Sequence, residues 1–395
     1  MANDMTMRLP EAAGTGEVRT DFRRPVYCLL GVPIDAVDLP GAARILTGAM
    51  ASGTRCVMTT PNLNNLVAMQ RDPAFRDAVI RNELSVADGM PLVWVSRLLG
   101  IPLKERVAGS DLFEWLGRRS AAPVRVYFFG GPEGAAQAAS DRLNAGTGPM
   151  RCVGFQSPGF GDVEALSRAE MIERINGSDA DFLVIAMGTA KGHVWIERNR
   201  PLLRTRVISH LGAVVNFAGG KLSRAPALMR RLGLEWVWRI KEEPALWRRY
   251  WDDGRAFLPL LFTRVVPSVL ERALRAVAGR GRPPGAAVVR EGETVRLGLS
   301  GTWLARDLPV LRDILEREMR NPGDVEIDAG ALGGADEAFV GLLMLVYGHQ
   351  SKLGRAFRIQ SAGGAVRRAF RRRCAEFLLE GLPGAGTPPT RAGGE

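Results

Sequence analysis

The chain has 395 residues, of which 46% are hydrophobic and 24% are charged; this composition excludes wholesale disorder, collagen and long coiled coils. At roughly 100–200 residues per domain, the length predicts two or three domains. The formal net charge is +11, and residues 221–282 carry 14 basic and 6 acidic side chains together with four of the eight tryptophans. A basic segment rich in tryptophan favours an anionic partner, either phosphate groups or an anionic membrane surface.

The four cysteines are far apart and form no CxxC pair. A disulfide framework and a metal cluster are therefore not expected, and a reducing compartment is. The sequence has no run of 18 uncharged apolar residues, and its first 25 residues lack the apolar core of a signal peptide. We expect a cytoplasmic protein, soluble or peripheral to a membrane, with a disordered tail over residues 1–25.

Between residues 26 and 262, short apolar runs alternate with helical stretches, the pattern of βα units around a mostly parallel sheet. The predicted strands cover 56–60, 85–87, 124–129, 152–155, 182–187 and 207–210, and helical spacing covers 72–82 and 133–143. Glycines follow several of these strands. Because ligands in open α/β sheets bind beyond the carboxyl ends of the strands, we expect a site at these turns.

The basic segment predicts two amphipathic helices. Apolar residues recur at every fourth position from Leu228 to Ile240, which indicates one helix beginning near Ser223 or Pro226. A second helix is predicted over 266–277. The charges around the first stripe are typical of a solvated face, and the tryptophans among them make an interfacial or phosphate-binding role an equal alternative.

The Gly/Pro/Arg stretch GRGRPPG at 279–285 predicts a linker, so that 263–285 holds an amphipathic helix and a linker. Beyond it, residues 286–381 predict a small α/β domain. Its strands are expected at 294–299, 324–328 and 356–360, and its helices at 308–319, 336–352 and 365–379. The Gly/Pro-rich end, 382–395, predicts a second disordered tail.

Polar residues follow two predicted strands, in TTPN at 59–62 and in ADGMP at 87–91. Thr60, Asn62 and Asp88 could converge on one cleft, or they could cap two helices, since Thr, Asn and Asp favour helix N-caps. Gly130 and Gly131 join a strand to a helix, where backbone N–H groups suit a diphosphate; a plain tight turn is the alternative. The GxGxxG pattern of dinucleotide sites is missing here.

Asp179 and Asp181 have the DxD spacing of metal-dependent sugar-nucleotide enzymes. They precede their strand, which predicts a structural loop at the opposite edge of the sheet. The three histidines lack metal-ligand spacing, and the sequence contains no GxSxG, HExxH or P-loop motif. We also find no nucleic-acid motif and expect no nucleic-acid partner.

Together these stretches resemble the WecG/TagA/CpsF glycosyltransferases, glycosyltransferase family 26, over about residues 32–257. The matching stretches are TTPN (59–62), ADGMP (87–91), ERVAGSDL (105–112), FFGG (128–131), DFLVIAMG (181–188), RAP (224–226), GLEWVWRIKEEP (233–244) and RRY (248–250). The resemblance implies a Rossmann-like α/β domain over 26–262 with a helical appendage over 221–262. It also implies an inverting transferase without metal or cofactor. Such an enzyme moves a sugar, such as N-acetylmannosamine or a related hexose, from a UDP-sugar to a polyprenyl-diphosphate-linked saccharide, in the synthesis of exopolysaccharide or another surface glycan.

The resemblance also implies residue roles. Asp88 would be the general base that deprotonates the acceptor hydroxyl. Donor contacts would come from Thr60, Asn62, Arg106, Gly109, Asp111, Gly130, Gly131, Gly188 and Lys191. The acceptor diphosphate would be held by Arg224, Arg239, Arg248 and Arg249, at the inner face of the cytoplasmic membrane.

One family stretch, G-x-P-K-Q-E-x-W-I, is changed to GTAKGHVWI at 188–196. Ala190, Gly192 and His193 replace Pro, Gln and Glu, and loss of the Gln amide removes a hydrogen-bond donor and acceptor. Three interpretations are open: a changed substrate, compensation by His193, or reduced activity. The last leads to an alternative function, a catalytically impaired scaffold or regulator.

The C-terminal domain resembles a STAS domain, the fold of anti-sigma-factor antagonists, through VEIDAGALGGADEAFVGLLML at 325–345. The family places a phosphorylatable Ser after an Asp, whereas Glu337 follows Asp336 here. Glu carries a permanent negative charge, loosely like phosphoserine. We therefore expect a module that docks a protein partner without a kinase switch.

Overall fold

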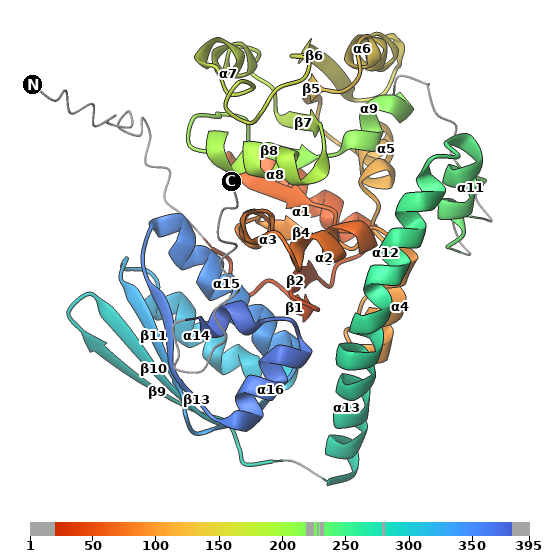
Figure 1. The fold of residues 1–395 in the computed structure, drawn as a ribbon. Coiled ribbons are helices and arrows are strands. Elements are labelled where there is room, and N and C mark those ends of the chain that lie inside the picture. Colours follow the sequence, from red (N-terminus) through yellow and green to blue (C-terminus); the bar gives the residue numbers. More distant parts are fainter. Residues whose placement is uncertain (1–19, 219–224, 227–228, 230–232, 279–280, 381–395) are drawn as a thin grey trace, which may run out of the picture.

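The structure, a computed structural model, describes residues 20–218, 225–226, 229, 233–278 and 281–380. Its larger sheet has six parallel strands in the order β4-β3-β8-β7-β5-β6 (Figure 1). These are β3 (Cys56–Thr59), β4 (Leu84–Ser85), β5 (Val124–Gly130), β6 (Met150–Gln156), β7 (Phe182–Ala186) and β8 (Val207–His210). Every strand predicted for this part of the chain forms, and the Rossmann-like α/β fold is confirmed.

Helices cover both faces of this sheet. One face packs against α1 (Leu39–Ser52), α5 (Gly109–Arg119), α6 (Ala135–Ala145) and α9 (Gly212–Ala218), and the other against α7 (Ala169–Asn176) and α8 (Thr189–Asn199). A third cluster lies beside β4. It joins α2 (Leu63–Met69), α3 (Pro73–Ile80) and α4 (Met90–Leu99) to the antiparallel hairpin of β1 (Val26–Leu29) and β2 (Val32–Asp35).

The appendage contains a short helix, α11 (Glu235–Glu242), and a long one. The long helix runs from α12 (Leu246–Leu260) through a π-helical turn (Leu261–Val265) into α13 (Val266–Ala278). Pro259 lacks a backbone N–H, and the π turn that follows it keeps the helix continuous. The boundary expected at 262/263 therefore falls inside a helix.

The prediction of one helix from Leu228 to Ile240 is wrong. Gly233 has a φ of +75°, a left-handed conformation that interrupts a helix, so α11 begins only at Glu235. Leu228 and Leu232 lie outside the described residues.

The C-terminal domain has a second sheet in the order β12-β10-β11-β13, with β9 antiparallel to β10. Its elements are β9 (Gly285–Glu291), β10 (Thr294–Trp303), α14 (Leu308–Glu318), β11 (Asp324–Ala329), β12 (Leu332–Ala335), α15 (Glu337–Leu353), β13 (Phe357–Ala362) and α16 (Gly364–Arg372). Strands β9 and β12 were not predicted. The helix expected over 365–379 ends early, because Cys374 has a φ of +52°.

Helix α15 lies between this second sheet and the first domain (Figure 1). Two glycines permit the close approach: a Cβ on Gly341 would lie 2.6 Å from the Val26 carbonyl oxygen, and one on Gly348 would lie 2.8 Å from that of Ile80. Phe22 is only 2% exposed in the same core. The tail expected over 1–25 therefore does not extend to residue 25, because Phe22 is buried and Arg24 pairs with Asp35 at 2.7 Å.

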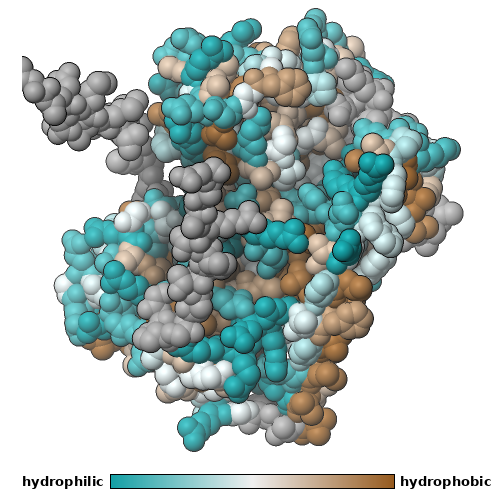
Figure 2. Space-filling model, in the orientation of Figure 1, coloured by the Kyte–Doolittle hydropathy of each residue, from teal (hydrophilic) through white to brown (hydrophobic). Residues whose placement is uncertain are grey.

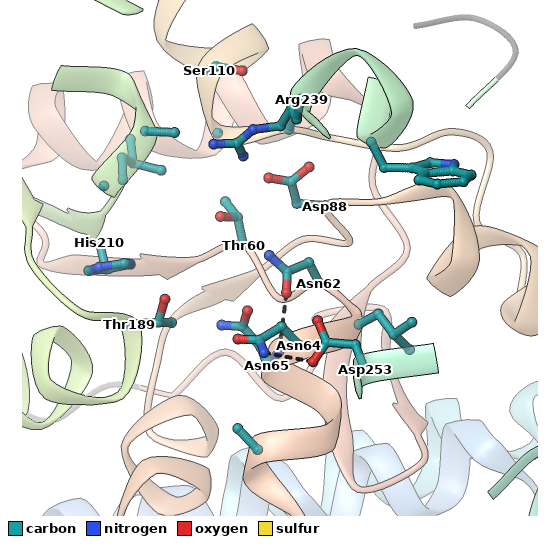
Figure 3. Close-up of a pocket in the computed structure, with 18 of the residues that line it drawn as sticks. Thr60, Asn62, Asn64, Asn65, Asp88, Ser110, Thr189, His210, Arg239 and Asp253 are labelled. Carbon is teal, nitrogen blue, oxygen red and sulfur yellow. Dashed lines mark hydrogen bonds between the residues drawn. The ribbon is translucent and has the colours of Figure 1, made fainter. Parts of the chain in front are cut away.

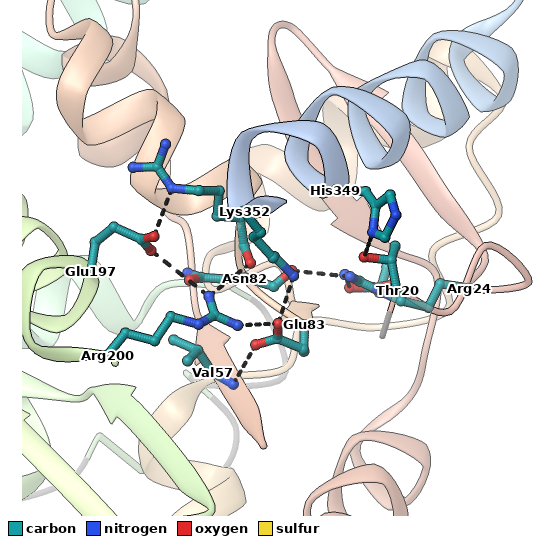
Figure 4. Close-up of polar contacts among 11 residues, drawn as sticks. Thr20, Arg24, Val57, Asn82, Glu83, Glu197, Arg200, His349 and Lys352 are labelled. Carbon is teal, nitrogen blue, oxygen red and sulfur yellow. Dashed lines mark hydrogen bonds and ion pairs between the residues drawn. The ribbon is translucent and has the colours of Figure 1, made fainter. Parts of the chain in front are cut away.

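A buried ion cluster also joins the two domains (Figure 4). Glu83, just before β4, accepts hydrogen bonds from Lys352 Nζ at 2.6 Å, from the Val57 backbone N–H at 2.9 Å and from Arg200. Burial alone would raise the pKa of Glu83, but Lys352 and Arg200 lower it to about 2. The carboxylate is thus ionised and fully partnered across the domain junction.

The carboxylate of Glu337, whose charge the sequence likens to that of a phosphoserine, is buried inside the domain. Its Oε1 lies 3.0 Å from Arg373 Nη2, and the two side chains are 11% and 3% exposed. This charge is neutralised inside the domain and is not displayed to a partner as a phosphoserine would be.

Candidate active site

A cavity of about 880 Å³ lies beyond the carboxyl ends of β3, β7 and β8, and the appendage covers one side of it. Predicted site residues meet there (Figure 3). Those that line it are Thr60, Asn62, Asp88, Arg106, Gly109, Gly188, Arg239 and Arg249.

Asp88 follows β4, and its backbone N–H donates to the Pro61 carbonyl at 2.8 Å. Gly89, with a φ of +134°, is the N-cap of α4, and no side chain caps that helix. The helix-cap alternative is therefore wrong for Asp88, whose side chain lies on the cavity wall and is 31% exposed. Burial raises the pKa of Asp88 to about 6; Arg106 opposes this shift, while Glu235 and Asp111 add to it.

Arg106 is shared by three carboxylates. Its Nη1 lies 2.5 Å from Glu235 Oε2 and 3.9 Å from Asp88 Oδ1, and its Nη2 lies 2.7 Å from Asp111 Oδ2. Asp111 itself does not line the cavity, and it contacts Arg106, which does. Sequence reasoning missed Glu235, which reaches Arg106 from 129 positions away along the chain and attaches α11 over the site.

Asn62 has both of the roles considered for it. Its Oδ1 accepts from the Asn65 backbone N–H at 3.1 Å and so caps α2, while its amide nitrogen points toward the side of Thr60 and Asp88 (Figure 3). Nearby, Asn64 Nδ2 donates to Asp253 Oδ1 at 2.8 Å, which ties α2 to α12. The appendage is thus fixed at both ends of the cavity.

The opposite wall comes from the ends of β7 and β8. It includes His210 at the end of β8, and Gly188, Thr189 and Gly212 at the starts of α8 and α9. His193 also lines it, with Nε2 3.2 Å from Thr59 Oγ1. Burial lowers the pKa of both histidines, so both rings are neutral at pH 7. No residue spacing in the sequence pointed to His210.

Other predicted residues do not line the cavity. Gly130 and Gly131 form the tight turn that was the alternative: a Cβ on Gly130 would lie 2.4 Å from the Ala186 oxygen, and the Gly131 N–H donates to that oxygen at 2.5 Å. Lys191 Nζ donates to the Gly161 carbonyl at 2.8 Å. Arg248 lies 5.8 Å from the Trp247 ring centre, and Arg224 falls outside the described residues.

The DxD pair lies at the other end of the sheet, as expected. Asp181 accepts hydrogen bonds from the backbone and guanidinium of Arg125 at 3.0–3.1 Å. Within the described part of the chain, no group of three His, Cys, Asp or Glu side chains is placed to hold a metal ion.

A parallel sheet with a polar cavity at the carboxyl ends of its strands defines a Rossmann-like α/β enzyme. Residues 27–269 match the Glycosyl transferase WecG/TagA/CpsF family, and residues 286–374 match the Mlab-type STAS domain. The chain therefore belongs to the WecG/TagA/CpsF family and is a glycosyltransferase with a C-terminal STAS domain.

Two relatives carry the name N-acetylglucosaminyldiphosphoundecaprenol N-acetyl-beta-D-mannosaminyltransferase. The protein from Bacillus spizizenii is 30% identical over 46% of this chain and 69% of its own length. That from Bacillus subtilis is 26% identical over 49% and 74%. Among solved structures, a GTP-binding protein from Sulfolobus solfataricus in complex with GDP covers 66% of this chain and 90% of its own at 9% identity, with a TM-score of 0.17 that supports no argument.

Among the helices that the structure describes, none combines the length and apolar character needed to cross a membrane.

Proposed function

We propose that the chain transfers a sugar from a UDP-sugar to a polyprenyl-diphosphate-linked saccharide, with inversion at the anomeric carbon and with Asp88 as general base. The observation that carries this proposal is the position of Asp88. Its side chain does not cap a helix but lies on the cavity wall, and its pKa is raised to about 6. A carboxylate with this pKa is mostly ionised at pH 7 and is basic enough to accept a proton during reaction.

In the proposed step, Asp88 accepts the proton of an acceptor hydroxyl while that oxygen bonds to the anomeric carbon. The bond from that carbon to the UDP oxygen breaks, and its electron pair leaves with UDP. The starts of α8 and α9, at Gly188 and Gly212, bring backbone N–H groups and the positive ends of two helix dipoles to the cavity wall. These groups would stabilise the charge of the departing diphosphate.

The acceptor is proposed to enter on the appendage side. Arg239 of α11 and Arg249 of α12 line the cavity there and supply the cations that a lipid-linked diphosphate requires. Trp94 and Trp236 line the same side and are 46% and 43% exposed. Exposed tryptophan beside arginine suits the boundary between a bilayer and water.

An apolar stripe on the long helix, densest along α13, supports a bilayer as the surface that this side contacts (Figure 2). Its exposed residues recur at spacings of three, four or seven positions: Trp247, Trp251, Leu258, Phe262, Val266, Leu270, Leu274 and Val277. The helix from Leu246 to Ala278 is about 50 Å long at 1.5 Å per residue. Its apolar stripe and flanking arginines match an anionic membrane surface, which we place at the inner face of the cytoplasmic membrane.

The assay is UDP release with UDP-N-acetylmannosamine, UDP-N-acetylglucosamine and UDP-glucose as donors and an undecaprenyl-diphosphate-linked N-acetylglucosamine as acceptor. Asp88→Asn keeps the shape but removes the base, and should lower kcat by about 10²- to 10⁴-fold with an unchanged melting temperature. Asp252→Asn, an exposed carboxyl on α12, is the matched control. Turnover of Asp88→Asn within a few-fold of the parent would reject Asp88 as the base.

The products of such a transfer are lipid-linked oligosaccharides of the kind used for exopolysaccharide and other surface glycans. A scaffold function through the STAS domain is less well supported, because Thr60, Asn62 and Asp88 remain together in the cavity. A partner of the STAS domain would also have to bind away from the face of α15 that packs on β1 and α3.

A further inference from the structure

Gly192 and His210 fit together as a pair. A Cβ on Gly192 would lie 2.4 Å from Cδ2 and 3.1 Å from Nε2 of the His210 ring, and the first of these distances is shorter than real contacts allow. A side chain at residue 192 and an imidazole at residue 210 therefore exclude one another. The ring occupies the space into which a side chain at 192 would extend.

The His210 ring is held in one orientation. Its Nε2 lies 2.6 Å from the Met187 carbonyl oxygen. A carbonyl can only accept, so Nε2 carries the proton, and in the neutral ring Nδ1 is the nitrogen that can accept a hydrogen bond. The cavity wall thus holds a fixed, uncharged imidazole.

His193 is a weaker candidate for replacing the missing Gln amide. It is 3% exposed, and its Nε2 lies 3.2 Å from Thr59 Oγ1, at a strand residue that is itself completely buried. The two rings lie 5.3 Å apart, with His193 packed against Phe75 on another side. His193 therefore supports the wall, and His210 is the ring that replaces the side chain lost at 192.

We propose that His210 determines which donor sugar the enzyme accepts, by accepting a hydrogen bond from a hydroxyl or amide N–H of that sugar at the cavity wall, where a glycine at 192 leaves room for the imidazole ring. This inference rests on the proposed function, because it takes the cavity to be the donor site. It assigns to His210 the compensation that the sequence suggested for His193. His210 projects toward the same cavity as Thr60 and Asp88 (Figure 3).

The experiment compares His210→Ala, His210→Gln, Gly192→Ala and the double variant Gly192→Ala/His210→Ala, all in the full-length chain. UDP-sugar and UDP affinities are measured by calorimetry, and kcat/KM is measured for each donor. Gly48→Ala is the matched control, since it also adds a Cβ inside a helix but meets no atom within 4 Å.

His210→Ala should weaken binding of the preferred UDP-sugar by between about twofold and tenfold, the effect of one lost hydrogen bond, and flatten the preference among donors. UDP alone should bind as before, and His210→Gln should restore part of the preference. Gly192→Ala should lower both the melting temperature and donor affinity. The double variant should recover the melting temperature, because the Cβ then has room, but not the preference.

An unchanged donor ranking in His210→Ala would overturn the inference while leaving the transferase function in place. Equal weakening of UDP and UDP-sugar binding would also overturn it, since the contact would then be to the nucleotide. If the parent chain neither binds nor turns over any UDP-sugar, the proposed function fails, and this inference fails with it.

Discussion

The pH dependence of turnover tests the arrangement around Asp88. As the proposed general base, Asp88 must be ionised, so kcat/KM should fall as the pH drops through about 6, the pKa to which burial raises this carboxyl. Glu235 contributes to that value. Its oxygen and that of Asp88 contact the same Arg106 nitrogen, at 2.5 and 3.9 Å, so the two carboxylates are about 6 Å apart or less.

Replacing Glu235 with Gln removes this negative charge and leaves Arg106 to Asp88 and Asp111. A unit charge at about 6 Å contributes roughly 0.7 kcal/mol in water and roughly 2.8 kcal/mol at an effective dielectric of 20. That corresponds to about half a pKa unit to two units, downward, because a lost anion favours ionisation. The acidic limb of the kcat/KM profile should therefore move to lower pH.

The assay is UDP release between pH 4.5 and 8 for the parent, Glu235→Gln and Glu242→Gln, the last being an exposed charge on the same helix. Only Glu235→Gln should move the limb. A limb that stays in place or moves upward, in a variant that remains folded, would refute the coupling between the appendage and the base.

Three further predictions concern stability and surface binding. Lys352→Ala should lower the free energy of unfolding by about 3 kcal/mol, measured by urea denaturation, because it leaves Glu83 underpartnered. Since the folded pKa of Glu83, about 2, is below its ordinary value of 4.5, the parent should gain this stability above about pH 4.5 and lose it progressively toward pH 2. Gly341→Ala should lower the free energy of unfolding by about 2 kcal/mol in the same assay, whereas Gly254→Ala, with no atom near its Cβ, should be neutral or slightly stabilising. Trp251→Ala, at a side chain 66% exposed, should weaken sedimentation with anionic vesicles about tenfold and leave UDP affinity unchanged; equal sedimentation would reject the stripe as the membrane contact.

The strands of the larger sheet were predictable because each is a short apolar run that ends at a polar residue or glycine. The same logic placed Thr60 and Asp88 together, since parallel strands β3 and β4 are neighbours and bring their carboxyl ends to one edge. What local spacing did not decide was whether Asp88 caps a helix. That depended on Gly89, whose φ of +134° makes it the N-cap instead.

Contacts between distant segments were not predictable from the pattern. Glu235 meets Arg106 only because the appendage folds back over the cavity, and no periodicity encodes that return. Lys191 was assigned to the donor by position within a motif, yet its side chain turns to the Gly161 carbonyl on a neighbouring loop. Gly192 was noticed in the sequence because it replaces a Gln and so loses an amide. The consequence of this change could be seen only from the structure, in which the ring of His210, at the end of β8, lies next to residue 192.

For a related reason, the sequence did not predict that α15 packs against the first domain. A helix buried on all sides has no amphipathic stripe, so its sequence indicates a core without saying which surfaces complete it. Gly341 and Gly348 show that one of these surfaces is the transferase domain, since each lies against a backbone carbonyl from β1 or α3. The STAS resemblance predicted the fold of this domain correctly, but not that its helix packs within its own chain.

For the proposed transfer, the cavity and the apolar stripe together imply the sides from which the two substrates approach. Helix α4 begins beside Asp88 and packs against α13 (Figure 1). It carries two exposed apolar side chains, Trp94 and Leu98, and Trp94 also lines the cavity. If the long helix lies on a bilayer, Arg239 and Arg249 are at the side from which a lipid-linked diphosphate would enter, and the starts of α8 and α9 form the opposite wall. A membrane-bound acceptor and a nucleotide donor would then approach Asp88 from different sides, which allows UDP to leave without displacement of the lipid.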